Sequence, residues 1–498
     1  MKPTELPPRP PFDDELVDQL LSTPEGATFE FKRAGKNDRK LQTIVAFANA
    51  EGGYLVLGIE DEDKATGRER VHGVDENPES IDELRRLLQT RITPQLAPPD
   101  HVAPQFIPIG CTLRDGSRGS IVIVKVDKSP AIHSIIDGGT YVRLSRSNRQ
   151  LAAPEITELS MQRGTRSWVG ELADVSIELL ETQHWREYAA SRRLSRPFQE
   201  ALLHLGLARS ELGARIVPTR AAVLLFAEEP SGLLDAKCSI RLFQYAGSSI
   251  EHSTRTNLIR PPKTIGGPLH VQIREAKRAL VDALATGVQM GPLGFEIVQR
   301  YPLRVLEEGI TNAVLHRDYR LPADIQIRVF EDRVEIESPG VLPGNVTVAN
   351  LREVGSRPRN RALVDHLREF PNPPNLDAGE GVRMMFETME RASLYPPLFS
   401  SRPDLPRDAV LFTCFNESRP DVWTQVEHHL DAHGVIGNAE VRLLLRTDDT
   451  VRASRLLKSW VDRKLLVVAD PDAAKKSRRY RRPGAAELPS LFAPRTGK

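Results

Sequence analysis

The chain has 498 residues, a formal net charge of +1, 40% hydrophobic residues and 27% charged residues. These values describe an ordinary globular protein of about three domains, and they exclude a global electrostatic field that would draw it to nucleic acid. Any nucleic-acid binding must therefore come from local basic patches.

Neither the cysteines nor the apolar segments indicate an oxidising or membrane compartment. Cys111, Cys238 and Cys414 are far apart and lack metal-ligand spacing, so we expect reduced thiols. The sequence has no run of about 18 apolar residues, and its Pro-rich start lacks a hydrophobic signal core. We therefore expect a cytoplasmic protein with no membrane partner.

The first region, residues 1–165, has the pattern of an α+β domain. A strand-like TFEFK at 28–32 precedes a helix pattern at 41–50 and the apolar strand pattern YLVLGI. The segments IVIVKV and YVRLS, further along, also read as strands. This mixture predicts a sheet with helices packed against it.

Acidic residues gather around the first of these strands. Strand alternation places Glu30 and Lys32 on one face, opposite two phenylalanines. Glu25 lies at the turn that enters the strand, and Glu60 and Asp61 end the apolar strand. Three converging carboxylates could hold a divalent metal ion that activates water, with Lys32 neutralising a phosphate. An edge ion pair between Glu30 and Lys32, without catalytic meaning, explains the same spacing.

Residues 166–290 alternate apolar runs with helical stretches, and we expect an intermediate α/β region that packs on the next domain. That domain, residues 291–418, contains the segment LEEGITNAVLHRDY, in which Glu308 and Asn312 stand one helical turn apart. A carboxylate beside an amide suits a site where Mg²⁺ bridges nucleotide phosphates while a base orients water. The segment therefore predicts ATP binding.

A predicted hairpin and a glycine-rich helix start follow that segment. The strand patterns IQIRVF and VEIES lead to Ser338, Pro339 and Gly340. Further on, Gly379 and Gly381 open GEGVRMMFETM, where backbone N–H groups at a helix start can receive phosphates. Three arginines between these motifs either approach phosphate or form a solvated helix start: Arg357, Arg359 and Arg361.

Residues 419–485, ahead of a tail at 486–498, have the pattern of a winged helix. Helix candidates at 421–433 and 438–446 precede a third helix with an apolar stripe, and two short wing-like segments follow. Basic residues of the third helix and the wing are the expected nucleic-acid contacts: Arg452, Arg455, Lys475, Lys476, Arg478, Arg479 and Arg481. A solvated basic face that only packs or dimerises explains the same residues.

The N-terminal motifs PEGATFEFK and FANAEGGYLVLGIED resemble the Schlafen core domain of AlbA_2 type. In Schlafen-type nucleases, two glutamates of this motif and an acid after the GGY strand form a metal-dependent RNA-cutting site. The resemblance implies catalytic and metal-binding roles for Glu25, Glu30 and Glu60, with Asp61 as a rival third ligand. Glu60 stands where aspartate is usual, and many bacterial relatives with this motif are DNA-binding regulators.

The segment LEEGITNAVLHRDY is similar to the N-box of the gyrase, histidine-kinase and mismatch-repair (GHKL) ATPase superfamily, whose ATPase domain is an α/β sandwich. The likeness implies that Asn312 coordinates magnesium and that Glu308 orients or deprotonates the attacking water. Gly340 matches the glycine of the adenine-binding motif. Gly379 and Gly381 resemble the second glycine box. Ser338 replaces the usual acidic residue, although its hydroxyl can still hydrogen-bond the exocyclic amine of adenine.

The three parts together resemble bacterial ATP-binding transcriptional regulators, so we expect a multidomain α+β protein. The preferred hypothesis is a homo-oligomer, dimeric or larger, in which ATP and Mg²⁺ or Mn²⁺ gate metal-dependent cleavage of RNA or DNA. The alternative is an ATP-responsive DNA-binding transcriptional regulator without cleavage activity. A third possibility is an ATPase scaffold for a partner protein.

Overall fold

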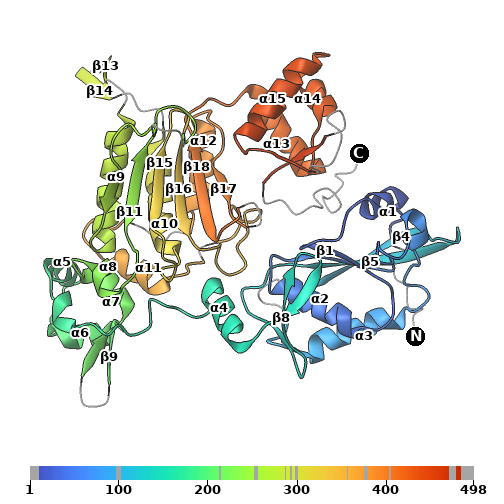
Figure 1. Ribbon diagram of the computed structural model, residues 1–498, viewed down its shortest axis with the longest axis horizontal. Coiled ribbons are helices and arrows are strands. Elements are labelled where there is room, and N and C mark those ends of the chain that lie inside the picture. The colour runs from blue at the N-terminus through green and yellow to red at the C-terminus, as the bar shows by residue number, and fades with distance from the viewer. Residues whose placement is uncertain are drawn as a thin grey trace, which may run out of the picture. The chain divides into compact units, whose positions relative to one another are not determined.

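The chain forms two compact units, one ending at Thr165 and one beginning at Arg166. Both units mix helices with sheets, which confirms the predicted multidomain α+β class (Figure 1). Within the described ranges, no helix is both long and apolar enough to cross a lipid bilayer. The computed structural model describes residues 10–96, 103–211, 215–251, 256–285, 288–291, 294–297, 301–355, 357–374, 379–402, 405–469 and 478–483.

The first unit is built on a four-stranded sheet in the order β1-β2-β5-β4, with β1 parallel to β2 and the other neighbours antiparallel. A smaller sheet has the order β3-β6-β7-β8. The elements of this unit are α1 (Asp14–Leu21), β1 (Phe29–Lys32), α2 (Asp38–Ala48), β2 (Gly53–Leu57), η1 (Gly67–Arg70), α3 (Glu79–Thr90), β3 (Ile92–Thr93), β4 (Gln105–Thr112), β5 (Arg118–Val126), β6 (Ser134–Ile135), β7 (Gly139–Leu144), β8 (Ser147–Gln150) and α4 (Ala153–Arg163).

Both faces of the larger sheet are buried. Phe29 and Phe31 of β1 join a core cluster with α1, because alternate side chains of a strand point to the same face. Leu55 and Leu57 of β2 join a second cluster with α2 on the opposite face. Glu30 follows the same alternation and is turned toward α2, which makes it a buried carboxylate.

The second unit contains a six-stranded sheet in the order β12-β11-β15-β16-β18-β17, in which only the β11–β15 pair is parallel. Its elements up to the end of this sheet are η2 (Ile177–Leu180), α5 (Gln183–Ser191), α6 (Phe198–His204), β9 (Ala208–Ser210), β10 (Ile216–Pro218), α7 (Arg220–Phe226), α8 (Pro230–Leu233), β11 (Ile240–Gln244), β12 (Lys263–Ile265), α9 (Leu269–Leu284), β13 (Val288–Gly291), β14 (Gly294–Ile297), α10 (Leu303–His316), β15 (Ile325–Val329), β16 (Arg333–Pro339), α11 (Arg361–Leu367), α12 (Gly381–Arg391), β17 (Leu398–Ser400) and β18 (Ala409–Phe415).

Helices α9, α10 and α12 pack on one face of the six-stranded sheet (Figure 1). Alternate residues of the strands, such as Val334 and Ile336 of β16, share one core cluster with these helices. Helix α10 approaches the sheet closely, because a Cβ atom on Gly309 would lie 2.8 Å from the ring of Phe412. The sheet and its helices therefore form two layers, and the candidate nucleotide motifs lie where α10, α12 and β16 meet.

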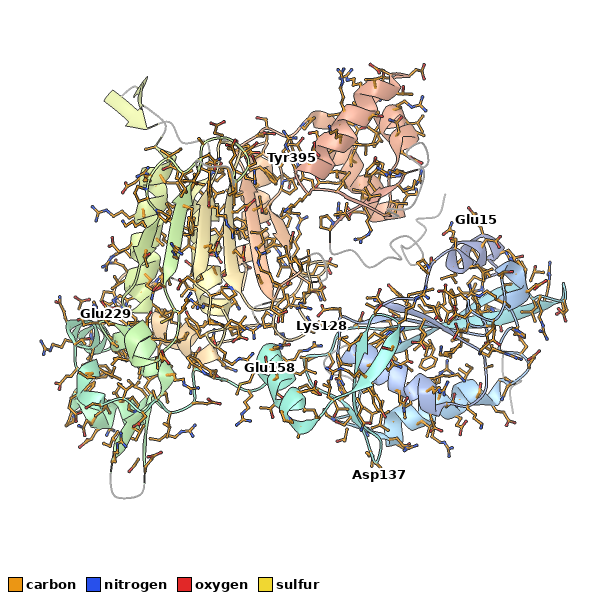
Figure 2. The ribbon with its side chains drawn as sticks, in the orientation of Figure 1. Glu15, Lys128, Asp137, Glu158, Glu229 and Tyr395 are labelled. Carbon is orange, nitrogen blue, oxygen red and sulfur yellow. The ribbon has the colours of Figure 1, made fainter. Side chains whose placement is uncertain are left out.

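Three helices and a short antiparallel ladder follow the sheet: α13 (Asp421–His433), α14 (Asn438–Leu445), α15 (Thr450–Asp462), β19 (Val467–Val468) and β20 (Tyr480–Arg481). Trp423 and Trp460 pack edge to face at their centre, with ring centroids 5.0 Å apart. Tyr395, labelled in Figure 2, belongs to the same core cluster and accepts a hydrogen bond of 3.2 Å from the Trp460 indole. This contact joins the C-terminal helices to the segment between α12 and β17.

Candidate functional site

A cavity of about 850 Å³ lies in the second unit beside α10, α12 and the end of β16. Its wall combines apolar side chains with charged groups, as is usual for small-molecule sites. All six residues expected to contact ATP or its metal line this cavity: Glu308, Asn312, Ser338, Gly340, Gly379 and Gly381. Residues from three separate segments of the chain are thus brought to one site.

Two helices fix the carboxylate of Glu308 at the cavity wall. The amide Nδ2 of Asn312, one turn later on α10, donates a hydrogen bond of 3.0 Å to Glu308 Oε1. The same oxygen lies against the first residue of α12, because a Cβ atom on Gly381 would be only 1.9 Å away. Glycine is therefore required where α12 begins if this carboxylate is to keep its place.

These groups fit a magnesium ion with a phosphate chain. One N–H of the Asn312 amide donates to Glu308, and the amide oxygen is a ligand of the kind that Mg²⁺ prefers. The 11-residue helix α12 directs the unpaired N–H groups of its first turn toward its N-terminus, where an anion is stabilised. When bound, magnesium would neutralise phosphate charge at this position.

Ser338 lies near the end of β16, two residues before Gly340. It is 7% exposed, and its hydroxyl donates a hydrogen bond of 2.8 Å to the main-chain carbonyl of Ala313 on α10. A hydroxyl that donates one bond still offers lone pairs. The Ser338 oxygen can therefore accept a hydrogen bond from an adenine amino group while it ties β16 to α10.

Lys277 of α9 also lines the cavity, although it belongs to none of the predicted nucleotide motifs. Burial lowers the pKa of this amine, while the charges of Glu307 and Glu308 oppose the shift. The signal in the sequence was an interrupted stripe, because Lys277 falls at helical spacing between the apolar Ile273 and Leu280. A lysine in that stripe places a cation near the carboxylate pair.

The arginines between the two glycine motifs divide into different roles. Arg357 lines the cavity. Arg359 is buried and donates to the carbonyl of His316 at 3.2 Å, so it caps the end of α10 rather than facing phosphate. Arg361 is 86% exposed in its side chain and pairs with Asp365 at 3.7 Å, as expected for a solvated helix start.

In the first unit, Glu30 is buried between two cations. Its carboxylate forms an ion pair with the buried Arg143 of β7 and a second one of 2.7 Å with Lys32. Lys32 in turn lies 3.7 Å from Asp61. Glu25 accepts a hydrogen bond of 2.9 Å from the backbone N–H of Phe31. These residues form one acidic cluster around Lys32.

Burial and close negative charges affect two residues of the acidic cluster, Glu25 and Asp61. Burial raises the pKa of Glu25, and the negative charges of Asp61 and Glu30 add to the shift. Asp61 Oδ1 is buried and receives no hydrogen bond. A buried carboxylate oxygen without a donor is costly, so Asp61 offers the cluster an unsatisfied acceptor.

Glu60 points away from this cluster. Its carboxylate pairs with Lys64 at 3.0 Å and Arg33 at 3.7 Å. Burial opposes its ionisation, but the hydrogen bond from Lys64 and the nearby positive charges outweigh burial and lower the pKa of Glu60. Neighbouring residues of an extended segment face opposite sides, and the structure places Asp61 rather than Glu60 beside Glu25 and Glu30.

The donor set of the acidic cluster does not converge on one point. In the described part of the chain, a single group of three potential ligands has its atoms within 4.8 Å of one another, and it lies on α5 and α9 instead. The carboxylate of Glu30 is also neutralised by Arg143 and Lys32. In this conformation the cluster fits an ion-pair network better than a metal centre.

The basic residues expected to contact nucleic acid are not equivalent. Arg452 and Arg455 are exposed on α15. Arg479 pairs with Glu440 at 2.5 Å, and Arg481 donates to the carbonyl of Arg482 at 3.2 Å. Arg478 is half-buried beside the last strand. Lys475 and Lys476 lie outside the described residues.

Comparison with known proteins places two domains within this chain. Residues 25–152 match the family described as "Schlafen, AlbA_2", and residues 323–405 match the HATPase_c_4 family, described as "Putative ATP-dependent DNA helicase recG C-terminal". The chain carries domains of these two families, which confirms the predicted Schlafen-type and ATPase-type domains. The second match begins after α10, so it includes Ser338 and both glycine motifs but not Glu308 and Asn312.

Curated proteins give no match to the chain. Among solved structures, the DIP2311 protein from Corynebacterium diphtheriae is similar, with 19% sequence identity and a TM-score of 0.40. The alignment covers 94% of this chain and 96% of that one.

Proposed function

We propose that the cavity of the second unit binds ATP with magnesium, and that nucleotide occupancy controls how the chain engages nucleic acid. The observation that carries the proposal is the Asn312–Glu308 hydrogen bond held against Gly381. It presents an amide oxygen, a carboxylate and a helix N-terminus to one cavity. The Schlafen-type and ATPase-type domains in the same chain support the link between nucleotide and nucleic acid.

Different residues around the cavity contact the adenine, the phosphates and the metal ion. Ser338 accepts a hydrogen bond from the adenine amino group, and the first turn of α12 receives the phosphates. Asn312 supplies an oxygen to the metal, and Glu308 orients a water molecule or removes its proton. Lys277 adds positive charge at the same wall and offsets the phosphates.

Nucleic-acid contact is proposed for the exposed face of α15. Arg452 and Arg455 are exposed there, while the opposite side of the helix buries Ala453, Leu457 and Trp460. A helix with one buried and one basic face can approach a phosphate backbone. In this account the protein is an ATP-responsive regulator that binds nucleic acid.

The coupling is tested by measuring the affinity of the full chain for labelled DNA and RNA, with and without Mg·ATP. An allosteric link of ordinary size changes the affinity by about 5- to 150-fold. Wild type is expected to show such a change and Asn312→Ala to lose it, while Asn416→Ala, which lies outside the cavity, retains it. An affinity that ATP leaves unaltered in wild type would overturn the proposed coupling.

Nucleic-acid cleavage is a second candidate function, favoured by Asp61. Its buried Oδ1 receives no hydrogen bond, and it lies beside Glu25, whose pKa is raised. A divalent ion that recruited Glu25 and Asp61 would satisfy this oxygen. It would also require Glu30 to exchange Arg143 for the metal, so cleavage depends on a rearrangement of the cluster.

The cleavage test uses labelled tRNA and single- and double-stranded DNA with Mg²⁺ or Mn²⁺, in the presence and absence of ATP. Metal-dependent products that disappear in Glu30→Gln and Asp61→Asn would support cleavage. Asp127→Asn is the matched control, because Asp127 forms an exposed pair with Lys125 of the same unit. Absence of products under every condition, or products unaffected by Glu30→Gln, would remove the nuclease function and leave the regulator.

A further inference from the structure

Two histidines and a glutamate meet in the second unit, away from the nucleotide cavity. His184 and Glu187 lie one turn apart on α5, and His270 is the second residue of α9. One ligand atom from each of the three lies within 4.8 Å of the other two. Across the described ranges this is the single group of this kind.

The imidazole of His270 is buried without a hydrogen-bond partner. The residue is only 9% exposed, and neither of its ring nitrogens is paired. The Nδ1 atom of His184 is likewise buried and unpaired. Buried polar atoms in folded proteins are nearly always satisfied, and a bound metal ion would satisfy one nitrogen lone pair on each ring.

An imidazole without a ring proton on one nitrogen keeps a lone pair there. Metal ions are coordinated through that lone pair.

Neighbouring residues hold the rings and the carboxylate in place. His270 stacks on Phe370 with ring centroids 4.2 Å apart, and the His184 and His270 rings meet edge to face at 5.0 Å. Gln183 donates a hydrogen bond of 2.9 Å to Glu187. Such outer contacts orient metal ligands in known sites.

A fourth ligand is within reach. Glu228 follows α7, and its Oε2 atom lies 3.3 Å from His184 Nε2. The next residue, Glu229, is labelled in Figure 2 close to α8. Two imidazoles and two carboxylates complete a four-ligand set of the kind that zinc accepts.

We propose that His184, Glu187, His270 and Glu228 bind a Zn²⁺ ion that ties α5 and the segment between α7 and α8 to the start of α9. Ligand atoms around tetrahedral zinc lie roughly 3.3 Å apart, given Zn–N lengths of about 2.0–2.1 Å. Modest side-chain rotations therefore close the present spacing of His184, Glu187 and His270, and Glu228 must turn its carboxylate from its contact with His184 toward the ion. Imidazole nitrogens favour zinc over Mg²⁺, which prefers an all-oxygen shell.

The ion would also stabilise a helix that reaches the nucleotide cavity. Lys277 lies two turns after His270 on α9 and lines that cavity. Zinc at the start of α9 would fix the position from which Lys277 approaches Glu308. The metal proposal itself rests on the histidine cluster and holds whether or not the cavity binds ATP.

The test titrates ZnCl₂ into the full chain after treatment with EDTA and dialysis. Wild type is expected to bind about one equivalent and to gain roughly 3–4 °C in Tm at free zinc about 100 times the Kd. The double variant His184→Gln/His270→Gln should lose more than about 100-fold in zinc affinity, because loss of even an outer partner costs 10- to 100-fold. His204→Gln, an exposed histidine on α6, is the matched control and should bind as wild type.

Cobalt binding provides a second measurement, which remains informative if the double variant does not fold. Co²⁺ in a four-coordinate site absorbs in the visible range, and wild type should show this band while Glu187→Gln weakens or shifts it. A wild type that binds no zinc at micromolar free metal would overturn the proposal. So would equal zinc affinity in wild type and the double variant, or Co²⁺-loaded wild type without a visible band.

Discussion

Asn312 donates a hydrogen bond of 3.0 Å to Glu308, which lies one turn earlier on α10 and against the first residue of α12. The pair is held from both sides, by an amide on its own helix and by a glycine of another. Because the Glu308 carboxylate lies directly against Gly381, a methyl group added to this glycine would displace it.

Gly381→Ala should displace Glu308 and weaken nucleotide binding while the fold persists. The added Cβ atom would lie 1.9 Å from Glu308 Oε1, which is the end of a flexible side chain and can swing away. We expect Mg·ATP affinity to fall by at least about tenfold, or about 1.4 kcal/mol, measured by calorimetry. Gly232→Ala, where a Cβ atom meets nothing within 4 Å, is the control. Equal losses in both variants would refute the role of the Gly381 contact.

Ser338→Ala should cost both stability and ATP affinity. The substitution removes the donor to the Ala313 carbonyl, which lowers the free energy of unfolding by about 0.5–1.5 kcal/mol in urea titrations. It also removes the acceptor for the adenine amino group. Ser401→Ala is a matched control, because buried Ser401 donates to the Ala409 carbonyl outside the cavity. The control should lose similar stability without loss of ATP affinity; if both variants bind ATP as wild type does, Ser338 has no role in recognition.

Contacts between residues that are close in sequence can be predicted from the sequence, whereas contacts between distant segments cannot. The spacing of Glu308 and Asn312 predicts a shared helix face, and their hydrogen bond is the direct consequence. The third member of the acidic cluster was not predictable from spacing. Glu60 and Asp61 are adjacent at the end of a strand, and only the bend of the chain decides which one turns toward Lys32.

Partners that are distant in sequence could not be predicted, because only the packed fold brings them together. Arg143 reaches Glu30 from a strand 113 residues away. The cap formed by Arg359 at the end of α10, and the meeting of His184 with His270, likewise need the packed fold. Nothing in the local pattern around these residues distinguishes a buried partner from a solvated charge.

Stability should fall as pH decreases through the range set by His366. Burial lowers the pKa of His366 to about 4 from an ordinary 6.5, with the charge of Arg192 adding to the effect, and its Nδ1 bonds the Tyr188 hydroxyl at 2.7 Å. Between these two pH values the unfolded chain binds a proton that the folded chain does not. The free energy of unfolding that His366 contributes is therefore fully present above pH 6.5. It is lost as the pH falls to about 4, and the loss is up to about 3 kcal/mol.

Urea titrations of wild type and His366→Gln at several pH values test this expectation. The variant should show a shallower loss of stability between pH 6.5 and about 4, and His204→Gln should match wild type because His204 is exposed. Parallel curves for wild type and His366→Gln would show that another group is responsible.

Nucleic-acid binding should depend on the exposed arginines of α15. Each phosphate contact contributes a slope of about −0.9 in a plot of log affinity against log salt. The double variant Arg452→Ala/Arg455→Ala should bind more weakly and with a slope shallower by about 2. Arg361→Ala removes another exposed positive charge, at the start of α11, and should leave the slope unchanged. Identical salt dependence in wild type and the double variant would show that the nucleic-acid interface does not include Arg452 and Arg455.

The central claim is that α10 presents a magnesium and nucleotide site, and isothermal titration of Mg·ATP into the full chain tests it most directly. Wild type and Asn416→Ala should bind with equal affinity, and Asn312→Ala should bind at least about tenfold more weakly, a change of about 1.4 kcal/mol. Equal affinity in wild type and Asn312→Ala, or no binding by wild type, would contradict the account.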